Sequence, residues 1–562
     1  MRVQLDGRRI VQWVSAASHH MAAPGDKPEE PERIFHARLR HLRAQATIDG
    51  ESQSGSHYRR VSHLSRDARE SKMNPTYALA RVLLVAATAF TCPALAAAPA
   101  APAVSVHAGL KQLQFTWNRV PEATRYELWF NPNTGASWVK YTELPLCRTS
   151  LAVNISAHLL NWQNARYVLK ACNASGCGRS LDLGVSHLMQ QTLGHFQPAA
   201  QLPRRWMGGT MALSEDGGTI AATIETNQSG GVEVFRKSPA GWAYEARLLA
   251  DPHMEQDLTA PADPAVDISG DGNVIALGIA LEVRPGAQPD SSTGAVYMFR
   301  RTSAGWVREG KLTFPDSLHE DQFGWRVDLD ESGTLLAASR RGAIEMFRRS
   351  TAGWTRVASP SPSCDPIGLS GDGGTLVRSC GSYGVEVLTA PDWQRVALLP
   401  NEVFSMEYSE SPRVVAVSHD GRSLAVRSVT LEAEGVTTRA WVNVFRLGAS
   451  GWVREATLGL SGVPSSDPAN PGNGYGLVLS MSRDGRFLAV GSYAGVFIYE
   501  RKSSGWSLRR FIDLPYTSRF PEPLFGASVS FGRNGKDLAV GAAWETSDAS
   551  GVNAAPGAVW LY

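Results

Sequence analysis

The sequence predicts an all-β chain in which one four-stranded unit occurs seven times, and three observations lead to this expectation. "GAVYMFRRTSAGW" at residues 294–306 returns almost unchanged as "GAIEMFRRSTAGW" at residues 342–354. Asp-Gly and Asn-Gly turns recur at intervals through the last two thirds of the chain. The 562 residues include 53 Gly, 32 Pro and 16 Trp, which fits many short strands joined by turns. A catalytic motif is normally needed once, so the repetition indicates architecture.

Length and charge limit the classes of function. A chain of 562 residues is too long for one ordinary domain, although a single repeat array could account for most of it. The formal net charge is +2, and no basic stripe runs along any segment. We therefore expect no nucleic-acid partner.

The N-terminal region divides into two segments. Residues 1–72 are rich in Arg, His and Ser, and we expect them to be disordered and to lie upstream of the true start at Met73. Residues 73–96 have the features of a secretory signal peptide: Arg81, an apolar core over 82–90, and an A-x-A cleavage site at 94–96. That core is too short to span a bilayer. The alternative is a basic arm followed by an apolar linker.

Export follows from the signal peptide. The chain is expected in the periplasm, on the outer surface or secreted, with no transmembrane segment after signal cleavage. A lipid anchor at Cys92 is a further alternative, but Phe90-Thr91 before it makes a poor lipobox.

Because the chain is expected to be exported, its cysteines are expected to be in an oxidising compartment. Cys172 and Cys177 bracket a tight turn, and Cys364 and Cys380 lie within one repeat, so both pairs are candidate disulfides. Cys147 is left over or displaces a member of one pair. Buried free thiols are the alternative for each cysteine.

Residues 97–190 precede the repeats and do not share them. Short runs that alternate apolar and polar residues, such as 112–117 and 125–131, predict a β-sandwich. Trp117, the Tyr126-x-Leu128 pair and the late "YVLKACNASG" at 167–176 resemble a fibronectin type III domain. The resemblance implies a spacer or binding module without catalysis.

Each of the seven copies opens with a turn of the S-x-D-G type. A small apolar strand follows, then a strand such as "GVEVF" or "GVFIY" and, in six copies, a short turn leading to a Trp. Asp-Gly and Asn-Gly allow the positive φ angles of tight hairpins. The turns begin at Ser214, Ser269, Asp330, Ser370, Ser418, Ser482 and Gly532, and the tryptophans are Trp242, Trp306, Trp354, Trp393, Trp452 and Trp506.

Such units must stack on one another. In 296–299 the alternation places Val296 and Met298 on one face, and Tyr297 and Phe299 on the other, so both faces need a neighbour. Seven units with short hairpins predict a seven-bladed β-propeller over 194–562, with an open solenoid as the alternative.

Closure of the ring is predicted from the two ends of the array. The last copy stops at Tyr562 without a fourth strand, whereas "GHFQPAAQLP" at 194–203 matches fourth-strand text just before the first copy. We expect 194–203 to pair with 556–562 as the outer strand of the last blade, which protects an open edge. A plain linker is the alternative.

The repeats resemble FG-GAP repeats of bacterial propellers, which are related to the integrin α-subunit propeller. Phe323-Gly324 and Phe525-Gly526, with Tyr475-Gly476 as a variant, carry the resemblance together with the strand text that follows. Many such repeats bind calcium through a D-x-D-x-D-G loop. Here the first and third acidic positions are mostly Ser, Gly or Arg, so we expect no cofactor and interpret the Asp-Gly residues as turn formers.

Long and variable loops fall on one face of the predicted propeller. They are 280–294, 429–440 and 545–557 between second and third strands, and 250–265 and 462–474 between units. Because function usually lies on loops held by a rigid scaffold, this face is the predicted ligand site. The expected function is non-enzymatic binding or adhesion at the cell envelope, with a protein or glycan partner.

An enzyme is the alternative hypothesis. Two adjacent loops combine the imidazole and carboxylate groups that metal or acid–base chemistry uses. They contain His253 with Asp251, Glu255 and Asp257, and His319 with Glu320 and Asp321. Solvated loop residues explain them equally well, and the sequence contains no G-x-S-x-G, H-E-x-x-H or phosphate loop. The alternative is thus a propeller hydrolase or lyase with a site at the channel mouth.

Overall fold

The computed structural model describes residues 97–199, 207–225, 230–251, 264–282, 293–314, 321–360, 367–380, 384–400, 414–431, 437–459, 475–492, 495–513, 525–543 and 557–562. In these ranges the regular structure is strand, apart from two short 3-10 turns, η1 (Ser186–Leu188) and η2 (Gln190–Thr192). The expected all-β class is confirmed. No helix in the same ranges has the length and hydrophobicity needed to cross a bilayer. The predicted extension (1–72) and signal peptide (73–96) lie outside the described residues.

Two sheets precede the repeats and form what we call the two-sheet unit. Antiparallel pairing gives a three-stranded sheet in the order β1-β2-β5 and a larger one in the order β4-β3-β6-β7, with β8 also on β6. The strands are β1 (Val104–Gly109), β2 (Gln112–Trp117), β3 (Arg125–Asn131), β4 (Val139–Pro145), β5 (Ser150–Asn154), β6 (Arg166–Asn173), β7 (Gly176–Arg179) and β8 (Leu183–Gly184).

Alternate residues of the two-sheet unit form its core. Phe115 of β2, Tyr126 of β3 and Tyr167 of β6 are almost fully buried in one apolar cluster. The rings of Phe115 and Tyr167 lie 5.1 Å apart. This follows from the period of two in strands, which sends every second side chain to the same face.

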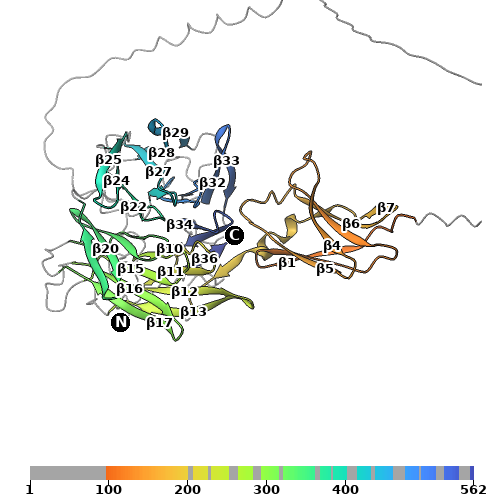
Figure 1. Cartoon of the computed structure of the whole chain (residues 1–562), viewed down its shortest axis with the longest axis horizontal. Coiled ribbons are helices and arrows are strands. Elements are labelled where there is room, and N and C mark those ends of the chain that lie inside the picture. The colour runs from red at the N-terminus through yellow and green to blue at the C-terminus, as the bar shows by residue number, and fades with distance from the viewer. Residues whose placement is uncertain are drawn as a thin grey trace, which may run out of the picture. The chain divides into compact units, whose positions relative to one another are not determined.

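The rest of the described chain forms seven four-stranded antiparallel sheets, coloured from yellow-green to blue in Figure 1. Sheet 1 is β10 (Met211–Leu213), β11 (Thr219–Glu225), β12 (Gly230–Ser238) and β13 (Gly241–Leu249); sheet 2 is β14 (Ala265–Ile268), β15 (Val274–Ile279), β16 (Ala295–Thr302) and β17 (Gly305–Leu312); sheet 3 is β18 (Val327–Leu329), β19 (Leu335–Arg340), β20 (Ala343–Ser350) and β21 (Gly353–Ala358).

The later sheets repeat the same order. Sheet 4 is β22 (Ile367–Leu369), β23 (Thr375–Ser379), β24 (Val385–Thr389) and β25 (Gln394–Leu399); sheet 5 is β26 (Val415–Val417), β27 (Ser423–Leu431), β28 (Thr437–Gly448) and β29 (Gly451–Gly459); sheet 6 is β30 (Val478–Met481), β31 (Phe487–Ser492), β32 (Gly495–Lys502) and β33 (Gly505–Ile512); sheet 7 is β34 (Phe525–Gly532), β35 (Asp537–Ala542), β36 (Ala558–Leu561) and β9 (Gly194–Phe196).

The first strands of these sheets follow one another in a circuit. β10 contacts β14, β14 contacts β18, and the series continues through β22, β26, β30 and β34. β34 in turn contacts β10. This arrangement is consistent with a β-propeller.

Both faces of each sheet pack against a neighbouring sheet. Tyr297 and Phe299 of β16 belong to an apolar cluster shared with sheet 1, whereas Val296 and Met298 belong to one shared with sheet 3. The predicted division of these four side chains is confirmed. The hydrophobic core of the repeats therefore lies between the sheets.

Sheet 7 combines the two ends of the repeat region. Phe196 of β9 pairs with Val559 of β36, and His195 pairs with Trp560. Strand β9 lies inside the segment 194–203 in which the sequence places the closing strand, and residues 200–206 lie outside the described ranges. The outer strand of sheet 7 therefore comes from the segment that precedes sheet 1 in the sequence.

Glycines allow neighbouring sheets to approach closely. A Cβ at Gly278 of sheet 2 would overlap the carbonyl oxygen of Gly324, and a Cβ at Gly541 of sheet 7 would overlap that of Gly208. Gly324 follows Phe323, so the Phe-Gly pair supplies a residue without a side chain where two backbones meet. Met207-Gly208 makes the same contact between sheets 7 and 1. Because Met207 stands where the other pairs have an aromatic residue, the sequence pattern does not reveal this copy.

Candidate functional site

The connections between strands divide each sheet into two ends. The backbone N–H of Arg301, near the end of β16 and next to the turn that follows it, donates to the carbonyl of Asn273, in the turn after β14, over 2.8 Å. First-to-second and third-to-fourth strand turns therefore share one end, which we call the turn end. The second-to-third strand loops and the connections between sheets lie at the other, the loop end.

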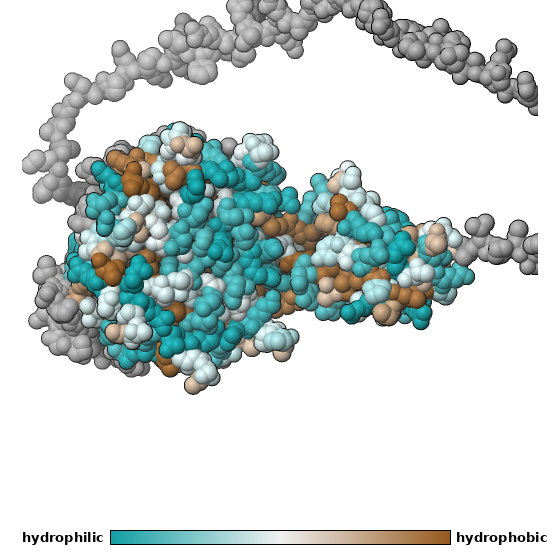
Figure 2. All heavy atoms as spheres, viewed as in Figure 1, coloured by the Kyte–Doolittle hydropathy of each residue, from teal (hydrophilic) through white to brown (hydrophobic). Residues whose placement is uncertain are grey.

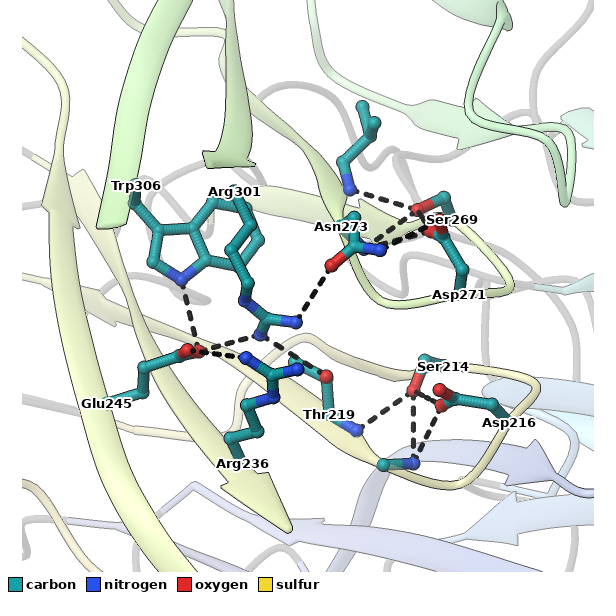
Figure 3. A network of polar contacts seen from close by, with 12 residues as sticks. Ser214, Asp216, Thr219, Arg236, Glu245, Ser269, Asp271, Asn273, Arg301 and Trp306 are labelled. Atoms are coloured by element: carbon teal, nitrogen blue, oxygen red, sulfur yellow. Dashed lines mark hydrogen bonds and ion pairs between the residues drawn. The ribbon is translucent and has the colours of Figure 1, made fainter. Parts of the chain in front are cut away.

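Side chains close each turn at the turn end. The hydroxyl of Ser214 accepts the backbone N–H of Thr219 over 2.9 Å and donates to Asp216 over 2.6 Å. Asp216 also accepts the N–H of Gly218. Figure 3 shows this arrangement, with Ser269 and Asp271 repeating it in the next sheet. These aspartates are bonded within their own turns, as a turn-forming role requires.

Backbone hydrogen bonds join the seven turns into a circuit. Gly270 donates to the carbonyl of Glu331, and Glu331 donates to that of Gly371. Equivalent links continue through the turns at 418–421 and 482–485, and Asn534 completes one link with its side-chain oxygen. Arg533 donates back to the carbonyl of Glu215, which joins sheet 7 to sheet 1. The turn end is thus a closed, hydrogen-bonded rim.

Ionisable side chains from separate turns meet at this rim. Nδ1 of His419 lies 2.8 Å from Glu331 Oε1, and Arg483 donates to Nε2 of His419 over 3.1 Å. A guanidinium only donates, so Nε2 accepts and the imidazole proton is on Nδ1. A Cβ at Gly371 would lie 2.6 Å from both Glu331 and His419, so this glycine leaves the space they occupy. Nε2 of this imidazole is therefore hydrogen-bonded, whereas Nδ1 lies within ion-pair distance of Glu331 without forming a hydrogen bond.

Glu215 lies in the electrostatic field of this group. Burial raises the pKa of its carboxyl to about 7, and the charge of Glu331 adds to the shift. Its carboxylate accepts the backbone N–H of Asn534 over 2.7 Å. The side chain therefore stabilises the same seam between sheets 7 and 1 as its backbone carbonyl does.

An ion pair links adjacent sheets near the turn end. Arg301 of sheet 2 lies 2.6 Å from the carboxylate of Glu245 in sheet 1, and Trp306 donates its indole N–H to the same oxygen over 3.1 Å. Figure 3 shows both groups converging on Glu245. The arrangement recurs twice among the described residues, as Glu309 with Arg349 and Trp354, and as Glu455 with Arg501 and Trp506. The repeated Arg and Trp of the opening motif thus act between sheets.

At the loop end, a polar network surrounds the points where two long loops leave the sheets. Asp251 is the last described residue before 252–263, and Glu282 is the last before 283–292. The hydroxyl of Tyr297 donates to Glu282 over 2.7 Å and accepts the backbone N–H of Asp251 over 3.0 Å. Lys311 pairs with both carboxylates, at 2.9 Å and 2.6 Å. One tyrosine and one lysine therefore hold both loop roots.

The charges of this network are matched. Hydrogen bonds from Arg308 and Lys311 lower the pKa of Asp251 to about 2. Burial raises the pKa of the Tyr297 hydroxyl above its ordinary value. The carboxylate therefore stays ionised and the phenol stays neutral across physiological pH. The network can therefore hold the loop roots in place.

The predicted metal or acid–base candidates are only partly within the described residues. His253, Asp257 and His319 lie outside them. Asp321 is described, and Oδ1 of its carboxylate lies 3.7 Å from Arg340. Sequence reasoning noted Asp251 only as a neighbour of His253; it missed Glu282, Tyr297 and Lys311, which lie far apart in the chain and share no motif.

The cysteines differ in their bonding. Cys172 and Cys177 form a disulfide, and Cys147 is an exposed free thiol. Cys380 is disulfide-bonded, and Cys364 lies outside the described residues. Among those residues, one group of metal-type ligands is close enough to share an ion, namely Glu127 with Cys172 and Cys177. Both sulfurs are in the disulfide and supply no thiolate, so this group does not suit a metal.

The visible surface carries few large apolar areas. Figure 2 shows hydrophilic side chains over most of this face, with hydrophobic ones in small separate groups. Exposed apolar residues lie on the outer strands of the sheets, namely Tyr244, Leu249, Val307, Val357, Val396, Leu398, Val453 and Leu508. Scattered exposed apolar residues of this kind are normal for folded proteins.

Comparison with known proteins adds little to this description. The chain matches no protein family and no curated protein. Among solved structures it is similar to a chain described as "Structure of U3-55K", at 12% sequence identity and a TM-score of 0.42, over 66% of this chain and 98% of that chain. A likeness of this size says nothing about function.

Proposed function

We propose that the chain is an exported, non-enzymatic binding protein of the cell envelope that recognises a protein or glycan ligand at the loop end. In this proposal the seven sheets are the blades of a β-propeller of the FG-GAP type, closed by β9. The two-sheet unit is a fibronectin type III-like module. Export follows from the predicted signal peptide at 73–96.

The observation that carries the proposal is the network at the loop roots. Asp251 and Glu282 begin two long connections, and Tyr297 and Lys311 hold both of them. Recognition loops bind more tightly when their ends are fixed, because less conformational entropy is lost on binding. The matched charges supply that fixation without forming a catalytic constellation.

The turn end supports the proposal by contrast. Its turns are short and use their side chains to close on themselves, as Ser214 and Asp216 do. The His419 imidazole lies between Glu331 and Arg483 of neighbouring turns. This end has the features of a structural rim, which leaves recognition to the loop end.

Replacing residues 252–263 and 283–292 with Gly/Ser segments of equal length tests the proposal. We expect binding at least tenfold weaker, which corresponds to about 1.4 kcal/mol, because the replaced loops carry the contacts while the roots at Asp251 and Glu282 remain. The full chain, expressed with its own leader, is assayed on a glycan array and against purified envelope proteins, and Kd is measured for each ligand found.

A turn-end variant serves as the matched control. Arg422→Ala combined with Lys502→Ala removes two exposed charged side chains at the opposite end. We expect Kd to stay within twofold of the parent value. Equal losses from the loop variant and the turn-end variant would contradict the proposal.

A further inference from the structure

The two-sheet unit contacts sheets 6 and 7 through one shared apolar cluster and through a small set of buried polar groups. Lys111, in the turn between β1 and β2, is 4% exposed, pairs with Asp537 of β35 and donates to the backbone oxygen of Tyr562. Its φ of 54° is in the left-handed region, which is unfavourable for a residue with a side chain.

Arg510 makes the second link. This residue of β33 donates to the carbonyls of Ala157 and Leu160 in the two-sheet unit, over 3.2 Å and 2.6 Å. The segment 155–160 is therefore held by sheet 6 while Lys111 is held by sheet 7. Sheet 7 is also the sheet that β9 closes, so the contact adjoins the closing seam.

His158 is at the centre of this contact. It is fully buried, and its Nε2 lies 2.9 Å from the carbonyl oxygen of Gly535, in the turn before β35. A carbonyl only accepts, so Nε2 carries the proton. Nδ1 is buried without a hydrogen-bond partner. The bound imidazole is thus neutral, with no acceptor for a second proton.

The charges that face His158 oppose its protonation. Lys111 from the two-sheet unit and Arg510 from sheet 6 are cations, and Asp537 from sheet 7 is an anion whose charge favours the protonated form. Asp537 is already paired with Lys111 and Arg533. The aromatic ring of Phe531 in β34 covers another side at 5.9 Å. Burial, reinforced by Lys111, lowers the pKa of His158 to about 3.

We propose that this contact is an acid-sensitive clasp: a proton taken up by His158 releases the two-sheet unit from sheets 6 and 7 while the sheets stay folded. The direction follows from linkage. A released, solvated histidine titrates near pH 6.5, whereas the clasped one stays neutral far below that. As the pH falls below about 6.5, the ratio of released to clasped molecules rises about tenfold per pH unit until the clasped form also protonates. The clasp does not depend on which ligand the loop end binds.

Small-angle X-ray scattering of the full chain between pH 7.5 and pH 4 tests the clasp. We expect the radius of gyration to increase on acidification with the steepness of a one-proton transition, while the far-UV circular dichroism of the sheets stays constant. The variant His158→Gln keeps an amide N–H donor but takes up no proton. In it, the acid expansion is expected to disappear. His107→Gln, at an exposed position of β1, is the matched control and should expand as the parent does.

Two results would overturn the clasp. One is a parent chain that does not expand, or a His158→Gln variant that expands at the same pH. The second result is obtained from the parent chain alone, so this test remains valid even if the variant folds poorly. In that measurement, the His158 ring is titrated by NMR, and a pKa near 6.5 in the compact form would remove the linkage on which the clasp depends.

Discussion

The substitution Phe196→Ala is expected to lower the free energy of unfolding of the repeated sheets by about 3–5 kcal/mol, the usual cost of removing a buried phenylalanine. Phe196 is 8% exposed and comes from β9, but its ring packs on sheet 1, 5.1 Å from Phe235 and 5.5 Å from Trp242. It therefore joins the last sheet to the first. Denaturant unfolding followed by tryptophan fluorescence measures the effect.

His195→Ala is the control for this substitution. His195 precedes Phe196 on the same strand and is exposed, stacked on Trp560 at 4.2 Å. Its removal is expected to cost less than about 1.5 kcal/mol, the upper value for one aromatic pair. Equal costs for the two variants would mean that Phe196 does not bridge sheets 7 and 1.

The second large effect is expected for Gly541→Ala. A Cβ at this position would overlap the carbonyl oxygen of Gly208 and the hydroxyl of Ser528, so the backbones of sheets 7 and 1 must separate. Overpacking of this kind costs about 1–3 kcal/mol. The loss is measured as a lower thermal midpoint in circular dichroism.

Gly310→Ala distinguishes this overlap from a general effect of alanine. At Gly310 in β17 the nearest atom to a new Cβ is a carbon of Trp354 at 3.9 Å, which is ordinary contact. Without a clash, Gly→Ala stabilises by about 0.4–1 kcal/mol because it restricts the unfolded chain. The two substitutions should therefore move the midpoint in opposite directions, and a gain at Gly541 would contradict the close approach.

The strand pattern and the turns could be predicted because their causes are local. Asp-Gly fixes a tight turn, and alternation in 296–299 decides which side chains face which neighbour. Phe323-Gly324 was recognised as a motif, but its reason is a contact with Gly278 of the previous sheet, which no single copy reveals. For the same reason Met207-Gly208, which has that role without the phenylalanine, was missed.

The ion pairs between sheets were missed although the sequence contains a signal for them. In one copy a glutamate stands three residues after the Trp. In the next copy an arginine stands two residues after the aromatic residue of the third strand. Glu245 and Arg301 are such a pair. The junctions between sheets 3 and 4 and between sheets 4 and 5 lack both members of the pair. Val357 and Val396 stand at the glutamate position, and Ala390 and Leu447 stand at the arginine position. The pairing becomes visible when the glutamate position of one copy is compared with the arginine position of the next copy.

The candidate site was predicted in outline only. Loop lengths indicate which end varies, because the alternating strand direction places those connections together. The network of Glu282, Tyr297 and Lys311 depends on how sheets 1 and 2 pack, and nothing in the separate segments encodes it. The clasp at His158 likewise depends on Gly535, far away in the chain.

Closure of the circuit by β9 is the central claim, and a designed disulfide tests it most directly. His195 and Trp560 stand directly opposite each other in the antiparallel pair. Directly opposite residues have Cα atoms about 4.5–5.5 Å apart, within the range that a disulfide spans. In the variant His195→Cys with Trp560→Cys, oxidation is expected to join residues 195 and 560, detected by peptide mass spectrometry. The exposed thiol of Cys147 competes for the same partners. A 195–560 link in most molecules agrees with closure; links to Cys147 or between chains, with no 195–560 link, would contradict it.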